Sequence, residues 1–232
     1  MMAGRVDWVR FLPLTPDRLI GDLAEWIVDL PQDHPRVGID GAAEIGAAAL
    51  ADALAQRLGE LGRPGLRATT SWWWRPASLR LELGRTDTDM LLGGWVDAGA
   101  LRRELLDPLG PAGSGRYLLR LRDPVTDRSV RDARATAPPR AALLLDGPLL
   151  LAAQLPLDAV IHLQTSRPTL ARALPADRQW WLDGFDRYLA EVRPTYQAAV
   201  VIAYDHPRAP AVAWAVDRED ATEQPDDFVA GD

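Results

Sequence analysis

At residues 37–50 the chain reads Val37-Gly38-Ile39-Asp40-Gly41-Ala42-Ala43-Glu44-Ile45-Gly46-Ala47-Ala48-Ala49-Leu50. An apolar segment, two glycines and an alanine-rich run predict a strand, a tight loop and a helix. The glycines have the spacing of a phosphate-binding loop, G-x-x-x-x-G-K-[ST], in which backbone N–H groups cradle phosphates, the lysine neutralises them and the hydroxyl binds Mg²⁺. Ala47 and Ala48 replace the lysine and the hydroxyl. An ordinary strand-to-helix turn is an equal alternative for so short a motif.

Apolar strands alternate with amphipathic helices along the rest of the chain. The apolar runs predict strands at residues 36–40, 66–71, 141–147, 159–164 and 198–204. Helical spacing predicts helices at 16–29, through Leu50 to near Gly62, and at 98–106, 167–174 and 177–192. Residues 77–97 are read as irregular, and 117–122 with 129–135 as a two-stranded excursion. This alternation predicts an α/β fold in three layers, with a five-stranded parallel sheet between flanking helices.

The length bounds the domain organisation. A chain of 232 residues is long enough for one α/β domain with a substantial core. We predict a single domain at 1–217, made of an N-terminal helix and linker at 1–35 and a core at 36–216. Residues 218–232 are acidic and lack periodicity, which predicts a disordered tail.

Composition excludes several classes of function. The formal charge of −7 and the isoelectric point near 5.0 argue against nucleic-acid and anionic-membrane partners, which need a positive field. No run approaches a membrane-spanning length, so a cytoplasmic location is expected. The chain has no cysteine, and all 26 basic residues are arginine. The three histidines lack metal-ligand spacing, so no metal site is predicted, and His162 is read as a core residue.

Six blocks within residues 36–207 carry a resemblance to a known family. They are Val37-Gly38-Ile39-Asp40-Gly41, Arg75-Pro76, Ala100-Leu101-Arg102-Arg103-Glu104-Leu105-Leu106-Asp107-Pro108-Leu109-Gly110, Ala137-Pro138-Pro139, Leu145-Asp146-Gly147 and Tyr188-Leu189-Ala190-Glu191-Val192-Arg193-Pro194. In these blocks the chain resembles the uridine kinase-like branch of the P-loop nucleoside and nucleotide kinases, including its actinobacterial members. The resemblance implies a three-layer P-loop NTPase fold and ATP-dependent phosphoryl transfer to a nucleoside.

The chain departs from this family where the chemistry is expected. The resemblance assigns a phosphate loop, which here is Gly41, Ala42, Ala43, Glu44, Ile45, Gly46, Ala47 and Ala48. Ser71 stands where the family has an aspartate that acts as base, whereas Asp40 and Asp146 survive, the latter at the position that helps to place Mg²⁺. The former substrate cleft maps to Trp72, Trp73, Trp74, Arg75, Trp95 and Asp97, and the lid candidates are Arg172 and Arg178. Each of the two aspartates has an equal structural alternative to a role in Mg²⁺ binding. Asp40 could cap the loop, and Asp146 could be a solvated residue at the end of a strand.

Two functions follow from these departures. Because the lysine, the hydroxyl and the base are absent together, we predict a pseudokinase with a binding or assembly role and no catalytic residue. No cofactor is expected beyond residual phosphate or sulfate binding, or weak ATP binding. The alternative is an active ATP-dependent kinase with a non-standard phosphate site, in which arginine replaces lysine.

The chain has nine tryptophans, and three of them are consecutive in the segment where the family has its substrate-binding loop. Burying such rings is favourable, so we predict that Trp72, Trp73 and Trp74 lead a group that fills the cleft. If 72–74 are extended, Trp73 faces away from the other two. The opposite face, with Trp95, Trp180 or Trp181, is then an exposed patch for a homodimer or protein partner. The alternative is an open platform on which a flat ligand stacks.

Overall fold

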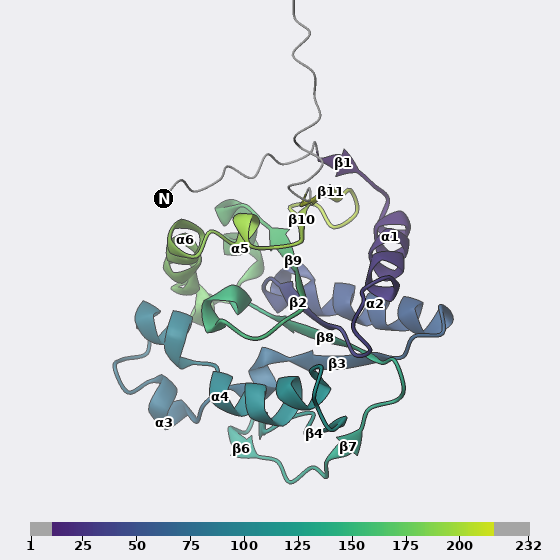
Figure 1. The fold of residues 1–232 in the computed structure, drawn as a ribbon. Helices are drawn as coiled ribbons and strands as arrows, with labels where there is room; N and C mark the ends of the chain where they lie inside the picture. The colour runs from purple at the N-terminus through teal and green to yellow at the C-terminus, as the bar shows by residue number, and fades with distance from the viewer. Residues whose placement is uncertain (1–10, 216–232) are drawn as a thin grey trace, which may run out of the picture.

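The computed structural model describes residues 11–215. The chain is organised around a seven-stranded sheet with the strand order β1-β11-β10-β9-β2-β8-β3 (Figure 1). Five of its strands are parallel, and numbered along the chain they have the order 2-3-1-4-5. In chain order these parallel strands are β2 (Arg36–Asp40), β3 (Gly65–Thr69), β8 (Ala142–Gly147), β9 (Ala159–Gln164) and β10 (Val200–Ala203). The predicted five-stranded parallel sheet is therefore confirmed, with β2 at its centre.

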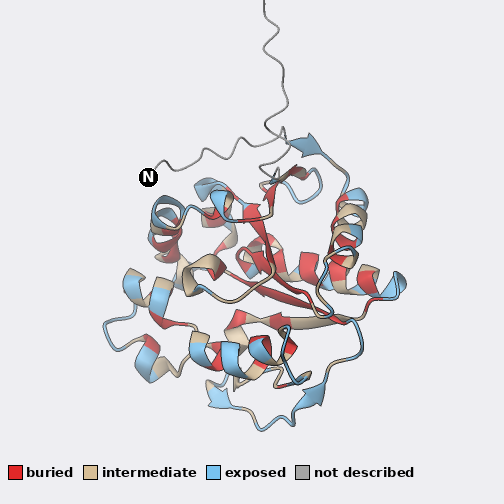
Figure 2. Cartoon of the chain, in the orientation of Figure 1, coloured by how far each residue is buried: buried red, intermediate tan, exposed pale blue. Residues whose placement is uncertain are grey.

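Helices cover both faces of the sheet, and β8 shows this most clearly. Ala142 and Leu144 pack in one cluster with α1 (Pro16–Val28) and α2 (Ala47–Glu60). Leu143 and Leu145 pack in a second cluster with α4 (Ala98–Leu101) and the π-helical turn Arg102–Leu106. Because both faces are covered, β8 is buried at every residue and reads as a continuous apolar run (Figure 2).

Two further helices complete the first cluster. They are α5 (Arg167–Ala173) and α6 (Trp181–Glu191), which lie between β9 and β10 in the chain. The predicted helix at 177–192 begins only at Trp181, because Ala176–Arg178 forms a separate 3-10 turn. This turn carries one of the two arginines predicted for the lid.

The structure corrects the second predicted strand. That strand ends at Thr69, and Thr70–Trp73 forms a 3-10 turn in place of the extended chain predicted to residue 71. A side chain at Gly147 would collide with Thr70, since an added Cβ would lie 2.0 Å from Thr70 Oγ1. The chain turns at this point because Thr70 packs directly onto the end of β8.

Smaller elements also differ from the prediction. The two-stranded excursion consists of two separate ladders, β4 (Arg116–Tyr117) with β7 (Ala135–Thr136) and β5 (Arg122–Asp123) with β6 (Arg128–Ser129). The segment read as irregular holds α3 (Ala77–Arg80) and a π-helical turn at Met90–Gly94.

Two antiparallel strands at one edge of the sheet were not predicted. They are β1 (Leu12–Pro13) and β11 (Ala211–Trp214), and β11 joins β10 to β1. The acidic tail predicted at 218–232 lies outside the described residues, and the single-domain division stays a prediction. Within residues 11–215, no helix combines the length and the apolar character needed to cross a bilayer.

Candidate functional site

The loop after β2 has the predicted strand, loop and helix order. Gly41 N donates to Gly147 O over 3.0 Å, and a Cβ at Gly41 would lie 3.1 Å from Leu163. Gly46 has a φ of +105°, which favours glycine, and α2 begins at the next residue. The loop lies at the carboxyl end of the central strand, where the strand order reverses and where open α/β sheets bind ligands.

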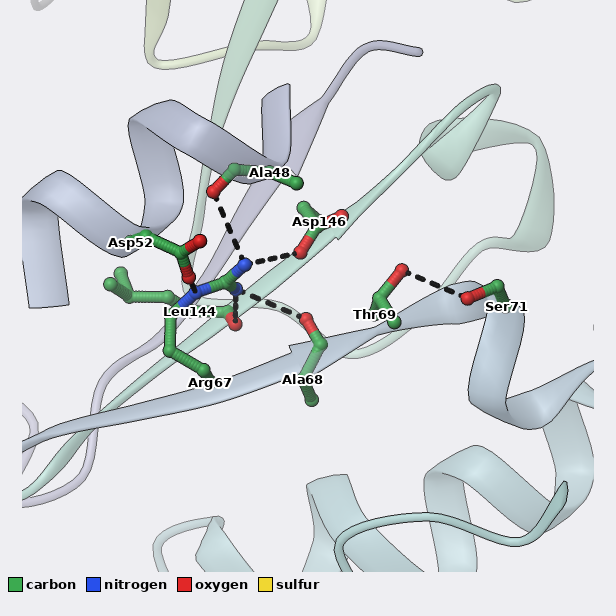
Figure 3. Close-up of polar contacts among 8 residues, drawn as sticks. All are labelled: Ala48, Asp52, Arg67, Ala68, Thr69, Ser71, Leu144 and Asp146. Atoms are coloured by element: carbon green, nitrogen blue, oxygen red, sulfur yellow. Dashed lines mark hydrogen bonds and ion pairs between the residues drawn. The ribbon is translucent and has the colours of Figure 1, made fainter. Parts of the chain in front are cut away.

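Arg67 on β3 supplies a positive charge beside this loop that the sequence did not reveal. Its guanidinium donates to Asp146 Oδ1 over 2.8 Å and lies 3.4 Å from the carbonyl oxygen of Ala48, at the position of the missing hydroxyl (Figure 3). A guanidinium has five N–H donors, and here all five have acceptors. The acceptors are Asp52 Oδ1, Asp146 Oδ1 and the carbonyl oxygens of Ala48, Ala68 and Leu144.

Asp146 is nearly inaccessible to water, with 3% of its side chain exposed. Burial raises the pKa of its carboxyl above the ordinary value, and this effect outweighs the Arg67 guanidinium, which lowers it. The ion pair therefore compensates only part of the desolvation of Asp146.

Asp40 is buried at the end of β2 and accepts three hydrogen bonds. Leu150 N donates to Oδ1 over 2.9 Å, and the Tyr188 hydroxyl and His162 Nδ1 each lie 2.7 Å from Oδ2. Burial and the Asp40 carboxylate both raise the pKa of Tyr188, so its hydroxyl keeps its proton and donates. Asp40 thus joins β2, β9 and α6, and His162 is buried, as predicted.

A cleft of about 230 Å³ brings several predicted site residues together. It is lined by the loop residue Glu44, by Ser71 in the turn after β3, by Asp146 near the end of β8, and by Arg178, one of the two predicted lid residues. Ser71 Oγ lies 3.4 Å from Thr69 Oγ1. Trp74 and Trp181 form the aromatic part of the wall.

The lid candidates differ in position. Arg178 Nη1 donates to Glu44 Oε1 over 2.6 Å, and its guanidinium lies 5.0 Å from the centre of the Trp181 ring. Arg172 instead donates to Thr169 Oγ1 on its own helix, at an exposed position outside the cleft lining. Of the two predicted lid arginines, only Arg178 reaches the loop.

Four tryptophans form a cluster beside the cleft. Ring centroids lie 5.1 to 6.4 Å apart, and the rings meet edge to face or tilted. The cluster consists of Trp74, Trp95, Trp180 and Trp181. Trp95 and Trp181 are buried, so the expectation that they form an exposed apolar face is wrong.

The consecutive tryptophans do not alternate. Trp73 is fully buried in the second cluster and Trp72 packs against that same cluster, whereas Trp74 packs against the first. The 3-10 turn is the cause, because side-chain alternation needs an extended backbone. Of the three consecutive tryptophans only Trp74 lines the cleft, together with Trp181, and the filling of a former substrate cleft stays a prediction.

The other two cleft candidates have structural contacts. Arg75 N donates to Trp95 O over 2.8 Å, which joins the two tryptophan-bearing segments. Asp97 caps α4, since its Oδ1 accepts from Ala100 N over 2.9 Å. Within the described part of the chain, no three acidic or histidine side chains gather to hold a metal ion.

Solved structures share this fold. A possible uridine kinase from Bacillus stearothermophilus has 21% sequence identity and a TM-score of 0.63, with 79% of this chain and 97% of that protein covered. A putative fructose transport system kinase from Silicibacter sp. TM1040 has 21% identity and a TM-score of 0.51, covering 78% and 89%. The YGR205w protein has 10% identity and a TM-score of 0.54, covering 87% and 97%.

No protein-family model matches the sequence, and no curated protein matches it. The structural likeness therefore carries the assignment of the fold alone. With its mainly parallel sheet, flanking helices and loop after the central strand, the chain has the three-layer fold of the P-loop kinases.

Proposed function

We propose that this chain is a pseudokinase, a protein with the P-loop kinase fold that binds or assembles without transferring phosphate. The observation that carries the proposal is the saturated guanidinium of Arg67. It lies between Asp146 and Ala48, the two positions that bind Mg²⁺ in the family that the chain resembles. With no donor left over, Arg67 has no free N–H group for a phosphate.

The charge around the cleft supports the same conclusion. Phosphoryl transfer depends on positive charge that neutralises the transferred group. The cleft is lined by two carboxylates, Glu44 and Asp146, and by one cation, Arg178. Arg67 pairs with Asp146 and Arg178 pairs with Glu44, so the net charge of the two ion pairs is zero. Among residues 11–215, the side chains that line the cleft therefore offer no surplus positive charge to a triphosphate.

Loss of the lysine, the hydroxyl and the base should have a large effect on binding and on the rate of phosphoryl transfer. Loss of one charge-assisted contact weakens binding by about 1.5 to 3 kcal/mol. Loss of a preorganised transition-state charge lowers the rate by about 100- to 1,000-fold more. Lysine, hydroxyl and base are all absent here, and Asp40, the surviving loop aspartate, is fully engaged by Leu150, His162 and Tyr188.

An ADP-release assay tests the proposal. Purified protein is incubated with Mg-ATP and with uridine, cytidine or fructose as acceptor, since the solved neighbours include a possible uridine kinase and a putative fructose transport system kinase. We expect no turnover above the rate without acceptor. Asp146→Asn serves as the control for contaminating kinases, because a contaminant is indifferent to it. If wild type shows turnover and Asp146→Asn does not, the protein is an active kinase with a non-standard phosphate site.

A further inference from the structure

Glu44 places a carboxylate inside the loop, between the two glycines that shape it. Its side chain is 19% exposed, and its Oε1 accepts from Arg178 Nη1 over 2.6 Å. The two residues are 134 positions apart in the chain. This ion pair joins the loop after β2 to the turn before α6.

The position of the Arg178 guanidinium is fixed by its neighbours. Its guanidinium packs over the Trp181 ring, and its turn is fixed by Gln179 Nε2, which donates to Ala171 O over 2.9 Å and to Leu174 O over 2.6 Å. Arg178 is also the single cationic side chain among the residues that line the cleft. Because Arg67 has no donor left over, Arg178 is the arginine of the cleft lining with which an entering oxyanion can pair.

We propose that Glu44 is an internal oxyanion that masks an anion-binding site formed by Arg178 and the cleft. The carboxylate offers the guanidinium the same acceptor oxygens as a phosphate or sulfate ion. As part of the chain it also competes at an effective concentration on the order of millimolar. The masked site takes one tetrahedral oxyanion without a metal ion. This inference rests on the proposed function, because it assumes a cleft that does not bind Mg-ATP.

Removing the charge of Glu44 tests the proposal. Glu44→Gln keeps the size of the side chain and leaves the Arg178 charge uncompensated. The matched control is Glu60→Gln, which removes a carboxylate paired with an arginine at the exposed end of α2. The second control is Glu44→Gln combined with Arg178→Gln. The probe is inorganic phosphate in the presence of EDTA, compared with potassium chloride at equal ionic strength.

Calorimetric titration gives the affinity, and tryptophan fluorescence reports on the cluster next to Arg178. We expect Glu44→Gln to bind phosphate about tenfold more tightly than wild type, which corresponds to about 1.4 kcal/mol. Glu60→Gln and the double variant should match wild type. Glu44→Ala provides the same measurement should the glutamine variant fail to fold.

Two results would overturn the masked site. One is unchanged phosphate affinity in both Glu44 variants, and the other is a gain that persists without Arg178. Both are distinct from failure of the proposed function, which is measured by ADP release. A variant that gains phosphate binding and still shows no turnover supports both proposals, whereas turnover in wild type removes the assumption on which the masked site rests.

Discussion

Arg67 and Asp146 form an ion pair of 2.8 Å across two neighbouring parallel strands, β3 and β8, directly beside the start of α2. Only 3% of the Asp146 side chain and 22% of the Arg67 side chain are exposed. Figure 3 shows the guanidinium enclosed by α2 on one side and the strands on the other. The Arg67 guanidinium thus occupies the space between Asp146 and the start of α2.

Replacing Arg67 with methionine should destabilise the protein by about 2 to 4 kcal/mol. Breaking a buried pair costs about 3 to 5 kcal/mol, and the partial exposure of Arg67 reduces that figure. Urea unfolding followed by circular dichroism measures the change. Arg57→Met is the matched control, because Arg57 pairs with Glu60 on an exposed helix face, and it should change stability by less than about 1 kcal/mol. Equal losses in the two variants would contradict the prediction.

Asp146→Asn should change the pH dependence of stability. Burial raises the pKa of Asp146 in the folded state, so between the unfolded and folded pKa values the folded protein binds more protons. Stability contributed by this group therefore falls as the pH rises through that window, which begins at about pH 4. The asparagine variant lacks this decline.

The measurement is the difference in unfolding free energy between wild type and Asp146→Asn, from urea titrations at several pH values above about pH 4. The difference should move in favour of the variant as the pH rises. Glu104 and Asp205 have lowered pKa values and act with the opposite sign, but they are present in both proteins and cancel. A constant difference would show that Asp146 does not titrate in this range.

The sequence predicted the elements whose causes are local. The apolar run at β8 and the helical spacing after Gly46 each lie within a few residues, and both elements formed where they were expected. The family resemblance then implied the P-loop fold, whose topology periodicity alone does not determine.

The features that the sequence did not predict depend on distant contacts. The turn at Thr70 arises because that side chain packs on Gly147, 77 residues away along the chain. Arg67 was visible only as a charged residue in a predicted strand, and its acceptors come from α2 and β8 as well as from its own strand. Strand β11 lacks a clear alternation and gains its partners from β10 and β1, which lie on either side of it.

Tyr188→Phe tests the network around Asp40. The variant loses the hydroxyl that donates to Asp40 Oδ2 and accepts from Leu151 N over 3.2 Å, and it leaves this part-buried N–H without its partner. We expect a loss of about 1 to 3 kcal/mol. Tyr196→Phe, at a residue that is 56% exposed, should be nearly neutral in the same urea titration. Equal stability of Tyr188→Phe and wild type would mean that Asp40 does not need the hydroxyl.

Restoring the motif residues alone should not restore Mg-ATP binding. Ala47→Lys, Ala48→Thr and Ser71→Asp return the lysine, the hydroxyl and the base, but Arg67 still occupies Asp146, and Ala47 is fully buried in the present loop. We therefore expect no Mg²⁺-dependent stabilisation by ATP in this triple variant. Adding Arg67→Ser frees Asp146 for a metal ion.

A thermal-shift comparison of Mg-ATP with ATP and EDTA provides the measurement. Saturating a restored site at about one hundred times Kd stabilises the folded state by about 2.7 kcal/mol, so the fourfold variant should show a shift of several degrees that EDTA abolishes. Adding Arg57→Ser in place of Arg67→Ser is the control, because it removes an exposed arginine on the helix that carries residues 47 and 48. A Mg²⁺-dependent shift in the triple variant itself would show that Arg67 yields its place to the metal, and the ion pair with Asp146 would then not be what prevents nucleotide binding.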